Sequence, residues 1–125
     1  MTKFKAKSFK EKIKNAVHGI ALALAAEKNL RIHFVIGLLV IIFGLLLNVG
    51  IEKLCILLLT IALVIITEMV NSAIEFTIDA LYKNKYSNLV RFAKDISAGA
   101  VLFVSIVAVI VGVLIFGEKL LMFMV

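Results

Sequence analysis

Long apolar runs alternate with short polar stretches along this chain, and the lengths of the runs match the thickness of a lipid bilayer. Residues 32–50 and 96–117 contain no Asp, Glu, Lys or Arg. A hydrocarbon core of about 30 Å is crossed by about 20 helical residues, so each run is long enough to span it. Residues 54–67 are also uncharged, but this third run reaches that length only by continuing through Glu68 and Asn71. The pattern predicts three transmembrane helices, at about residues 31–49, 53–80 and 93–117.

A second pattern precedes the first run. Its apolar residues recur at the spacing of one helix face, and they are Phe9, Ile13, Val17, Ile20 and Leu24. Lys10, Lys12 and Lys14 fall off that face. This pattern predicts an amphipathic helix at about residues 9–27, which would lie on the anionic inner leaflet of a membrane. The predicted fold class is therefore an all-α integral membrane protein, with three transmembrane helices and this N-terminal surface helix in a single domain, residues 1–125.

Composition and charge support a membrane protein. Hydrophobic residues make up 63% of the chain, far above a soluble composition. The net charge of +6 could suggest a nucleic-acid partner, but the basic residues sort by side of the membrane. All of them except Lys53 and Lys119 precede the first run or lie between the second and third. The positive-inside rule then places the N-terminus and the loop at residues 80–95 in the cytoplasm and the C-terminus outside, and we expect no nucleic acid as partner.

Small residues recur along the third run, among them Ser97, Gly99, Ser105 and Gly112. Such residues allow the backbones of membrane helices to approach closely. We therefore expect this helix to pack against protein rather than lipid, and a homo-oligomer is plausible because three short spans bury little by themselves.

Four polar side chains follow the second run, and they share one helix face. At 100° per residue, Asn71, Glu75 and Asp79 fall within about 60° of Glu68. Glu68 itself falls at or just inside the inner membrane boundary, where an ionisable residue is a functional hypothesis by default. The alternative is that Glu75 and Asp79 belong to an ordinary solvated helix end, with Asp79 paired to Lys83 four residues later.

Further polar residues are expected at the same level of the membrane. Glu27 ends the surface helix, and Lys94 and Asp95 begin the third span. Asp95 could be a helix cap and Lys94 an interfacial lysine, but neither explanation accounts for carboxylates from three segments at one level.

The donor set favours a hard cation. Carboxylates with an amide and a lysine suit Mg²⁺ held together with phosphates. The chain has no GxxxxGK[ST] loop and no protein-kinase signature, so it contains neither of the two common phosphate-binding loops. Cys55 is the only cysteine, which excludes an internal disulfide, and His33 is most simply an interfacial histidine. The residues alone indicate an acidic, metal-binding site at the membrane boundary.

Two stretches, "EMVNSAIEFTID" and "RFAKDISAGAVL", carry a resemblance to a known family. The chain resembles the prokaryotic diacylglycerol kinases, which are small three-span membrane kinases unrelated to soluble kinases. The signature E-x-x-N-[ST]-A-I-E-x-x-x-D is matched from Glu68 to Asp79, and A-K-D is matched by Ala93, Lys94 and Asp95. Glu27 matches the family's glutamate between surface helix and first span, and the resemblance covers essentially the whole chain.

The resemblance implies a homotrimer whose active sites lie at the cytoplasmic interface between subunits and transfer the γ-phosphoryl group of Mg-ATP to a lipid hydroxyl. By motif position Glu68 is the general base, and Glu27 and Glu75 are the Mg²⁺ ligands. The nucleotide-binding set implied in this way comprises Glu27, Glu75, Asp79, Lys94 and Asp95. Asn71, Asn29 and Arg31 are implied as supporting residues.

The family divides by acceptor lipid. The pattern at Glu27, Asn29 and Arg31, the "RIH" that ends with His33, and the absence of tryptophan resemble the undecaprenol kinase branch. Diacylglycerol is the alternative acceptor. A different class of function, a small non-enzymatic channel, would place ionisable residues along the depth of a pore, whereas here they gather at one interface. A membrane-remodelling protein would explain the lysines but not Glu68, Asn71 and Glu75.

Overall fold

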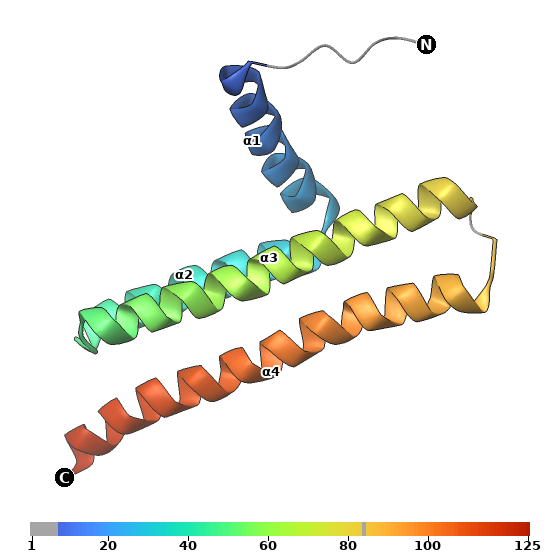
Figure 1. Cartoon of the computed structure of the whole chain (residues 1–125). Helices are drawn as coiled ribbons and strands as arrows, with labels where there is room; N and C mark the ends of the chain where they lie inside the picture. Colours follow the sequence, from blue (N-terminus) through green and yellow to red (C-terminus); the bar gives the residue numbers. More distant parts are fainter. Residues whose placement is uncertain (1–7, 84) are drawn as a thin grey trace.

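The computed structural model describes residues 8–83 and 85–125, and this part of the chain is all-helical (Figure 1). The helices are α1 (Phe9–Ala26), α2 (Lys28–Leu46), α3 (Ile51–Tyr82) and α4 (Asn88–Met124). The last three are long and apolar enough to cross a membrane. The predicted fold class is therefore confirmed, with one helix ahead of three that can span a bilayer.

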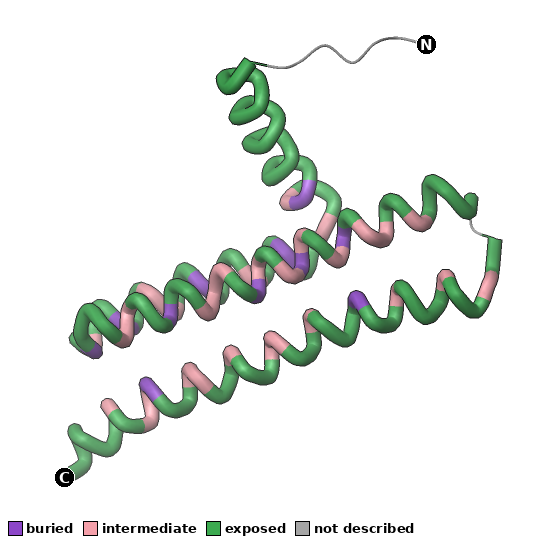
Figure 2. Tube along the Cα trace, in the orientation of Figure 1, coloured by how far each residue is buried: buried purple, intermediate pink, exposed green. Residues whose placement is uncertain are grey.

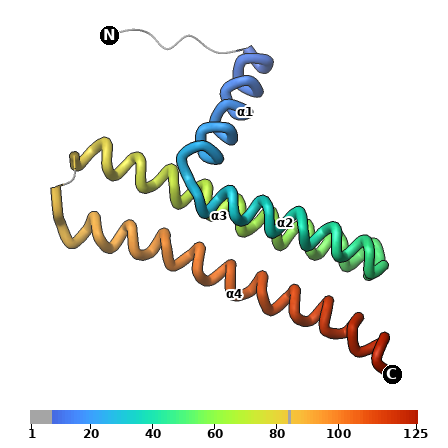
Figure 3. Tube along the Cα trace, turned by 180° about the vertical axis from the view of Figure 1, so that it is seen from behind, coloured from blue at the N-terminus to red at the C-terminus, as the bar shows by residue number. Residues whose placement is uncertain are grey.

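The three long helices run side by side, and consecutive helices point in opposite directions (Figures 1 and 3). α1 leans away from them and joins them only at its C-terminal end, where it meets α2. We call this end of the bundle the α1 end, and the end that holds the α2–α3 turn the far end. The α3–α4 connection lies beyond the α1 end, because both helices continue past the apolar runs into polar sequence.

The bend between α1 and α2 is held by defined contacts. Glu27 separates the helices with an extended backbone, at φ −113° and ψ 111°. The Arg31 guanidinium reaches back and donates from Nη1 to the carbonyl oxygens of Leu24, at 2.7 Å, and Ala25, at 3.0 Å. These carbonyls belong to the last turn of α1 and lack partners within the helix. A cationic side chain thus caps α1 and ties it to the first turn of α2.

The turn at the far end is short and uses two left-handed backbones. Asn48 has φ 54° and Gly50 has φ 99°, and glycine and asparagine are the residues that adopt such angles most readily. With only residues 47–50 between them, α2 and α3 must lie antiparallel and in contact.

Close packing is found between α2 and α3. A Cβ added at Gly37 would lie 2.6 Å from Ile61 Cγ2, and one added at Gly44 would lie 3.0 Å from Leu54 Cδ2. By contrast, a Cβ at Gly99 or Gly112 of α4 would meet nothing within 4 Å. Of the small residues predicted to pack against protein, Gly99 and Gly112 thus make no close helix contact within this chain, whereas Ser97 is buried and bonded to Asn71 of α3.

Few side chains are buried, and most of α4 is exposed (Figure 2). The buried apolar core at the far end comprises Val49, Leu57 and Ile115. Exposed apolar side chains on helices of this length are suited to lipid or to another copy of the chain. The predicted homotrimer stays a prediction.

Candidate active site

Glu68 is the most deeply buried charged residue in the described part of the chain, at 4% exposure. It lies on α3, one turn before Ser72, which is 2% exposed and donates its hydroxyl to the Glu68 backbone carbonyl at 3.1 Å. Glu27, His33 and Glu75 lie close enough to the Glu68 carboxyl to interact with it electrostatically. The structure thus brings three predicted carboxylates together, from the α1–α2 bend and from α3.

The fold explains this grouping. The extended backbone at Glu27 turns the chain so that the start of α2 packs against the C-terminal half of α3, with Leu30 fully buried. Glu75 lies seven residues after Glu68, which is two turns along the same face of α3. His33 was predicted only as an interfacial histidine, and its position near Glu68 is a finding of the structure.

A second polar group lies further along α3, towards the connection to α4. Lys94 of α4 donates to Asp79 Oδ1 at 2.7 Å, in an ion pair that remains partly exposed. Glu75 also interacts electrostatically with Lys94, so this residue connects the Glu68 group to the Asp79–Lys94 pair. Five of the residues predicted from the family motif therefore form one continuous polar zone at the α1 end: Glu27, Glu68, Glu75, Asp79 and Lys94.

A cavity of about 320 Å³ adjoins this pair at the α3–α4 connection. Of the predicted nucleotide-binding residues, Asp79, Lys94 and Asp95 line it, and Glu27 and Glu75 do not. Asp95 is exposed and makes a long ion pair with Arg91 on its own helix, at 3.6 Å. The cavity also has lining residues that the sequence analysis did not single out, which are Tyr82, Lys85, Tyr86 and Arg91.

The three residues predicted to support the site, Asn71, Asn29 and Arg31, have different surroundings in the structure. Asn71 accepts a hydrogen bond at Oδ1 from the Ser97 hydroxyl of α4, at 2.7 Å. Asn29 is exposed on the first turn of α2. Arg31 is bonded to the carbonyls of α1, so the contacts that the structure gives it are structural ones at the bend. The sequence analysis named Ser97 only as a small packing residue and did not predict its contact with Asn71. The similar distances of the two residues from the connecting loop are the only sequence signal for that contact.

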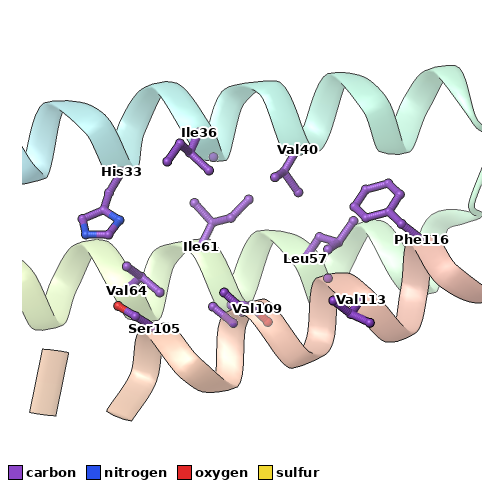
Figure 4. Close-up of a pocket in the computed structure, with 14 residues that line it drawn as sticks. His33, Ile36, Val40, Leu57, Ile61, Val64, Ser105, Val109, Val113 and Phe116 are labelled. Carbon is purple, nitrogen blue, oxygen red and sulfur yellow. The ribbon is translucent and has the colours of Figure 1, made fainter. Parts of the chain in front are cut away.

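An apolar groove of about 410 Å³ runs towards the far end between α2, α3 and α4 (Figure 4), and its lining includes His33, which interacts electrostatically with Glu68. His33 and Val64 lie at one end of it and Phe116 at the other. Val64 precedes Glu68 by one helical turn. From His33 to Val40 the groove follows α2 for about 10 Å, given the 1.5 Å rise of a helix. Apart from His33, Thr60 and Ser105 its lining is apolar, which suits a hydrocarbon chain.

The carboxylates fit a magnesium ion that arrives with a nucleotide. Within residues 8–83 and 85–125, no three His, Cys, Asp or Glu side chains are placed to hold a metal by themselves. Mg²⁺ in kinase sites is commonly bound by one or two carboxylates, with phosphate oxygens and water as its other ligands. Glu27 and Glu75, which both interact electrostatically with Glu68, supply two carboxylates of that kind.

Comparison with known proteins agrees with the motif. The family model described as prokaryotic diacylglycerol kinase matches residues 14–116. A protein of Synechocystis named diacylglycerol kinase is 42% identical over 94 residues, which are 75% of this chain and 54% of that protein. A protein of Bacillus subtilis named undecaprenol kinase is 36% identical over 106 residues, 85% of each chain. This chain thus spans about half the length of the Synechocystis protein and most of the Bacillus one.

The match covers α1 from residue 14 onwards, all of α2 and α3, α4 as far as residue 116, and every residue of the polar zone at the α1 end. The resemblance seen in the sequence motifs is confirmed, and the chain belongs to the prokaryotic diacylglycerol kinase family.

Proposed function

We propose that this protein is a membrane kinase that transfers the γ-phosphoryl group of Mg-ATP to the hydroxyl of a lipid alcohol. One observation carries the proposal: His33 lines an apolar groove and also interacts with the buried Glu68, which belongs to a zone of carboxylates with a lysine. A lipid alcohol needs a hydrocarbon site on one side of its hydroxyl and phosphate chemistry on the other. Both family relatives carry the names of lipid kinases.

Glu68 is the proposed general base. A lipid lying in the groove with its hydroxyl at the His33 end would present that hydroxyl to the region of Glu68. Removing the hydroxyl proton as the oxygen attacks phosphorus is a role that a positioned carboxylate performs in phosphoryl transfer. Because the groove already lies among the membrane-length helices, the acceptor needs no path through water.

The nucleotide is proposed to occupy the other side of Glu68. Asp79, Lys94 and Asp95 share the 320 Å³ cavity, and Lys94 carries the positive charge suited to a phosphate. Glu27 and Glu75 are the proposed Mg²⁺ ligands, with Asn71 as a supporting residue beside them. Bound Mg²⁺ neutralises charge on the phosphates, and the protein's own part is to position the two reactants.

Undecaprenol is the proposed acceptor, with diacylglycerol as the alternative. The pattern at Glu27, Asn29, Arg31 and His33 supports the first, as does a match that spans 85% of the Bacillus undecaprenol kinase. The higher identity to the Synechocystis diacylglycerol kinase supports the second. A channel is not favoured, because the groove between the helices has an apolar lining along its length.

We also propose that the active form is a homotrimer in the cell membrane, with the α1 end in the cytoplasm. The exposed apolar face of α4 is available for a second copy, and the basic residues cluster at the α1 end. A cytoplasmic α1 end would give the nucleotide cavity access to ATP.

The deciding experiment follows ³²P transfer from Mg-ATP to undecaprenol and to diacylglycerol in parallel, using the purified full-length protein in detergent. Glu68→Gln keeps the size of the side chain and removes the base, so we expect turnover to fall at least 100-fold, within the range typical of a lost general base. Glu52→Gln is the matched control, since Glu52 is a carboxylate in the first turn of the same helix at the far end. EDTA should stop transfer, and excess Mg²⁺ should restore it.

Preferential labelling of undecaprenol, lost only in Glu68→Gln, would support both the activity and the acceptor. Faster labelling of diacylglycerol would support the proposed phosphoryl transfer and would contradict undecaprenol as the acceptor. No labelling of either lipid, or equal activity in Glu68→Gln and Glu52→Gln, would contradict the proposed function.

A further inference from the structure

Ser97 is one of two buried residues in α4, at 8% exposure, and its hydroxyl bonds to another helix instead of to its own. On α3, the hydroxyls of Thr60, Thr67, Ser72 and Thr77 each donate to the carbonyl four residues earlier in their own helix. That local partner is available to any helical serine or threonine. Ser97 instead donates across to α3, to Asn71 Oδ1 at 2.7 Å.

The contact determines which way the Asn71 carboxamide faces. A carboxamide has an acceptor oxygen on one side and an NH₂ donor group on the other. With Oδ1 turned towards Ser97, the NH₂ group is turned away from that contact. Asn71 sits three residues after Glu68 and four before Glu75, so it shares their face of α3. Donors on that face are what a phosphate oxygen or a carboxylate requires.

We propose that Ser97 is a positioning residue for phosphoryl transfer, because it holds the Asn71 carboxamide with its NH₂ group towards the reacting groups. This inference rests on the proposed kinase function and adds to it a residue that lies outside the family motif. Ser97 itself need not touch either substrate. Without its hydroxyl, both orientations of the carboxamide become accessible, and the fraction of molecules with donors in place falls.

The location of Asn71 makes the orientation important. Lys53, near the start of α3, and Asn71 are separated by about 27 Å along the helix. That distance is close to the hydrocarbon thickness of about 30 Å, so Asn71 lies near the second membrane boundary. The Ser97 hydroxyl holds the amide there through a direct hydrogen bond, without a bridging water.

The test has two readouts. The first is the side-chain NH₂ signal of Asn71 in ¹⁵N-labelled full-length protein in detergent micelles, assigned by its disappearance in Asn71→Asp. The second is kcat and KM for Mg-ATP with the preferred lipid acceptor. The variants are Ser97→Ala, Ser97→Thr, which retains a hydroxyl, and Thr77→Ala, the control for removing an exposed hydroxyl that bonds only within its own helix.

We expect Ser97→Ala to shift the Asn71 signal and to lower kcat about five-fold, as the loss of one ordinary hydrogen bond would do, with little change in KM. Ser97→Thr should keep both at wild-type values, and Thr77→Ala should change neither. An unmoved Asn71 signal in Ser97→Ala would overturn the inference, as would a shifted signal with wild-type kcat.

The two proposals fail in different ways. A wild-type protein that phosphorylates no lipid alcohol contradicts the proposed function and, with it, a positioning role in that reaction. The Asn71 signal still decides by itself whether Ser97 holds the carboxamide.

Discussion

At the scale of single residues, the Asp79–Lys94 pair separates a contribution to folding from a contribution to function. Both side chains are partly exposed, at 48% and 38% respectively. An ion pair in such a position contributes little to stability, because water screens it and two flexible side chains must be ordered. Because both residues line the proposed nucleotide cavity, we expect their main contribution to be to nucleotide binding.

We therefore expect Asp79→Asn and Lys94→Gln to raise KM for Mg-ATP at least ten-fold, while the midpoint of thermal unfolding hardly moves. Lys94→Gln removes a charge-assisted contact to a phosphate, and Asp79→Asn weakens the ion pair that holds the Lys94 ammonium in place for that contact. The measurements are steady-state kinetics and unfolding in the same detergent. Lys53→Gln is the control, since it breaks a similar pair with Glu118, at 2.8 Å, at the far end of the same two helices.

An equal rise in KM for Lys53→Gln would show that the effect belongs to helix pairing and not to the nucleotide. Unfolding of Lys94→Gln at the assay temperature would contradict the expected small contribution to stability.

The sequence located much of the site and missed its supporting contacts for a physical reason. Glu68 and Asn71 stood out because polar residues at membrane depth are costly, and Glu75 followed from helix geometry. The convergence of Glu27 with them depended on a bend that hydropathy does not encode. Ser97 carries no such signal, since the hydroxyl of a serine in a membrane helix ordinarily donates to a backbone carbonyl of its own helix.

At the scale of elements, the contact between α2 and α3 depends on Gly37. The atom nearest to an added Cβ is Ile61 Cγ2, at 2.6 Å, which is fixed to a branched Cβ and moves only by rotation about χ1. Gly37 also lines the groove, so the spacing of these helices sets the width of the proposed lipid site.

Gly37→Ala should consequently destabilise the protein by about 1–3 kcal/mol, the usual cost of overpacking a well-packed contact. Gly99→Ala is a matched control on α4, where a Cβ meets nothing within 4 Å and alanine has the higher helix propensity. Unfolding in mixed micelles with increasing SDS would measure both. Equal stability of the two variants would contradict the close approach of α2 and α3.

Hydropathy predicted the helices because length and apolar content decide whether a segment can span a bilayer. It could not predict which of them approach closely. Gly37 and Gly44 on α2 resemble Gly99 and Gly112 on α4 as sequence patterns, and only the three-dimensional arrangement shows that the first two face a neighbour.

At the scale of the whole molecule, the remaining question is which end faces the cytoplasm. The α3–α4 connection and the end of α4 lie at opposite ends of the bundle (Figure 1). Basic residues predict that the first of these is inside.

Single cysteines can test this orientation in a Cys55→Ala background, because Cys55 is the chain's only cysteine. With a membrane-impermeant maleimide on intact cells, we expect Lys119→Cys to be labelled and Lys85→Cys to be labelled only after permeabilisation. The reverse pattern would place the proposed nucleotide cavity outside the cell and so contradict the use of cytoplasmic ATP.

Polar pairs join α3 and α4 at three heights, through Lys53 and Glu118, Asn71 and Ser97, and Asp79 and Lys94. Together they fix the register of the hairpin. Sliding α4 by one turn, about 5.4 Å, would separate all three pairs at once. Inserting or deleting one residue in the apolar stretch would rotate every position beyond it by about 100° and leave a charged partner facing lipid. The apolar residues between the pairs can therefore interchange with one another over evolutionary time, whereas their number cannot change.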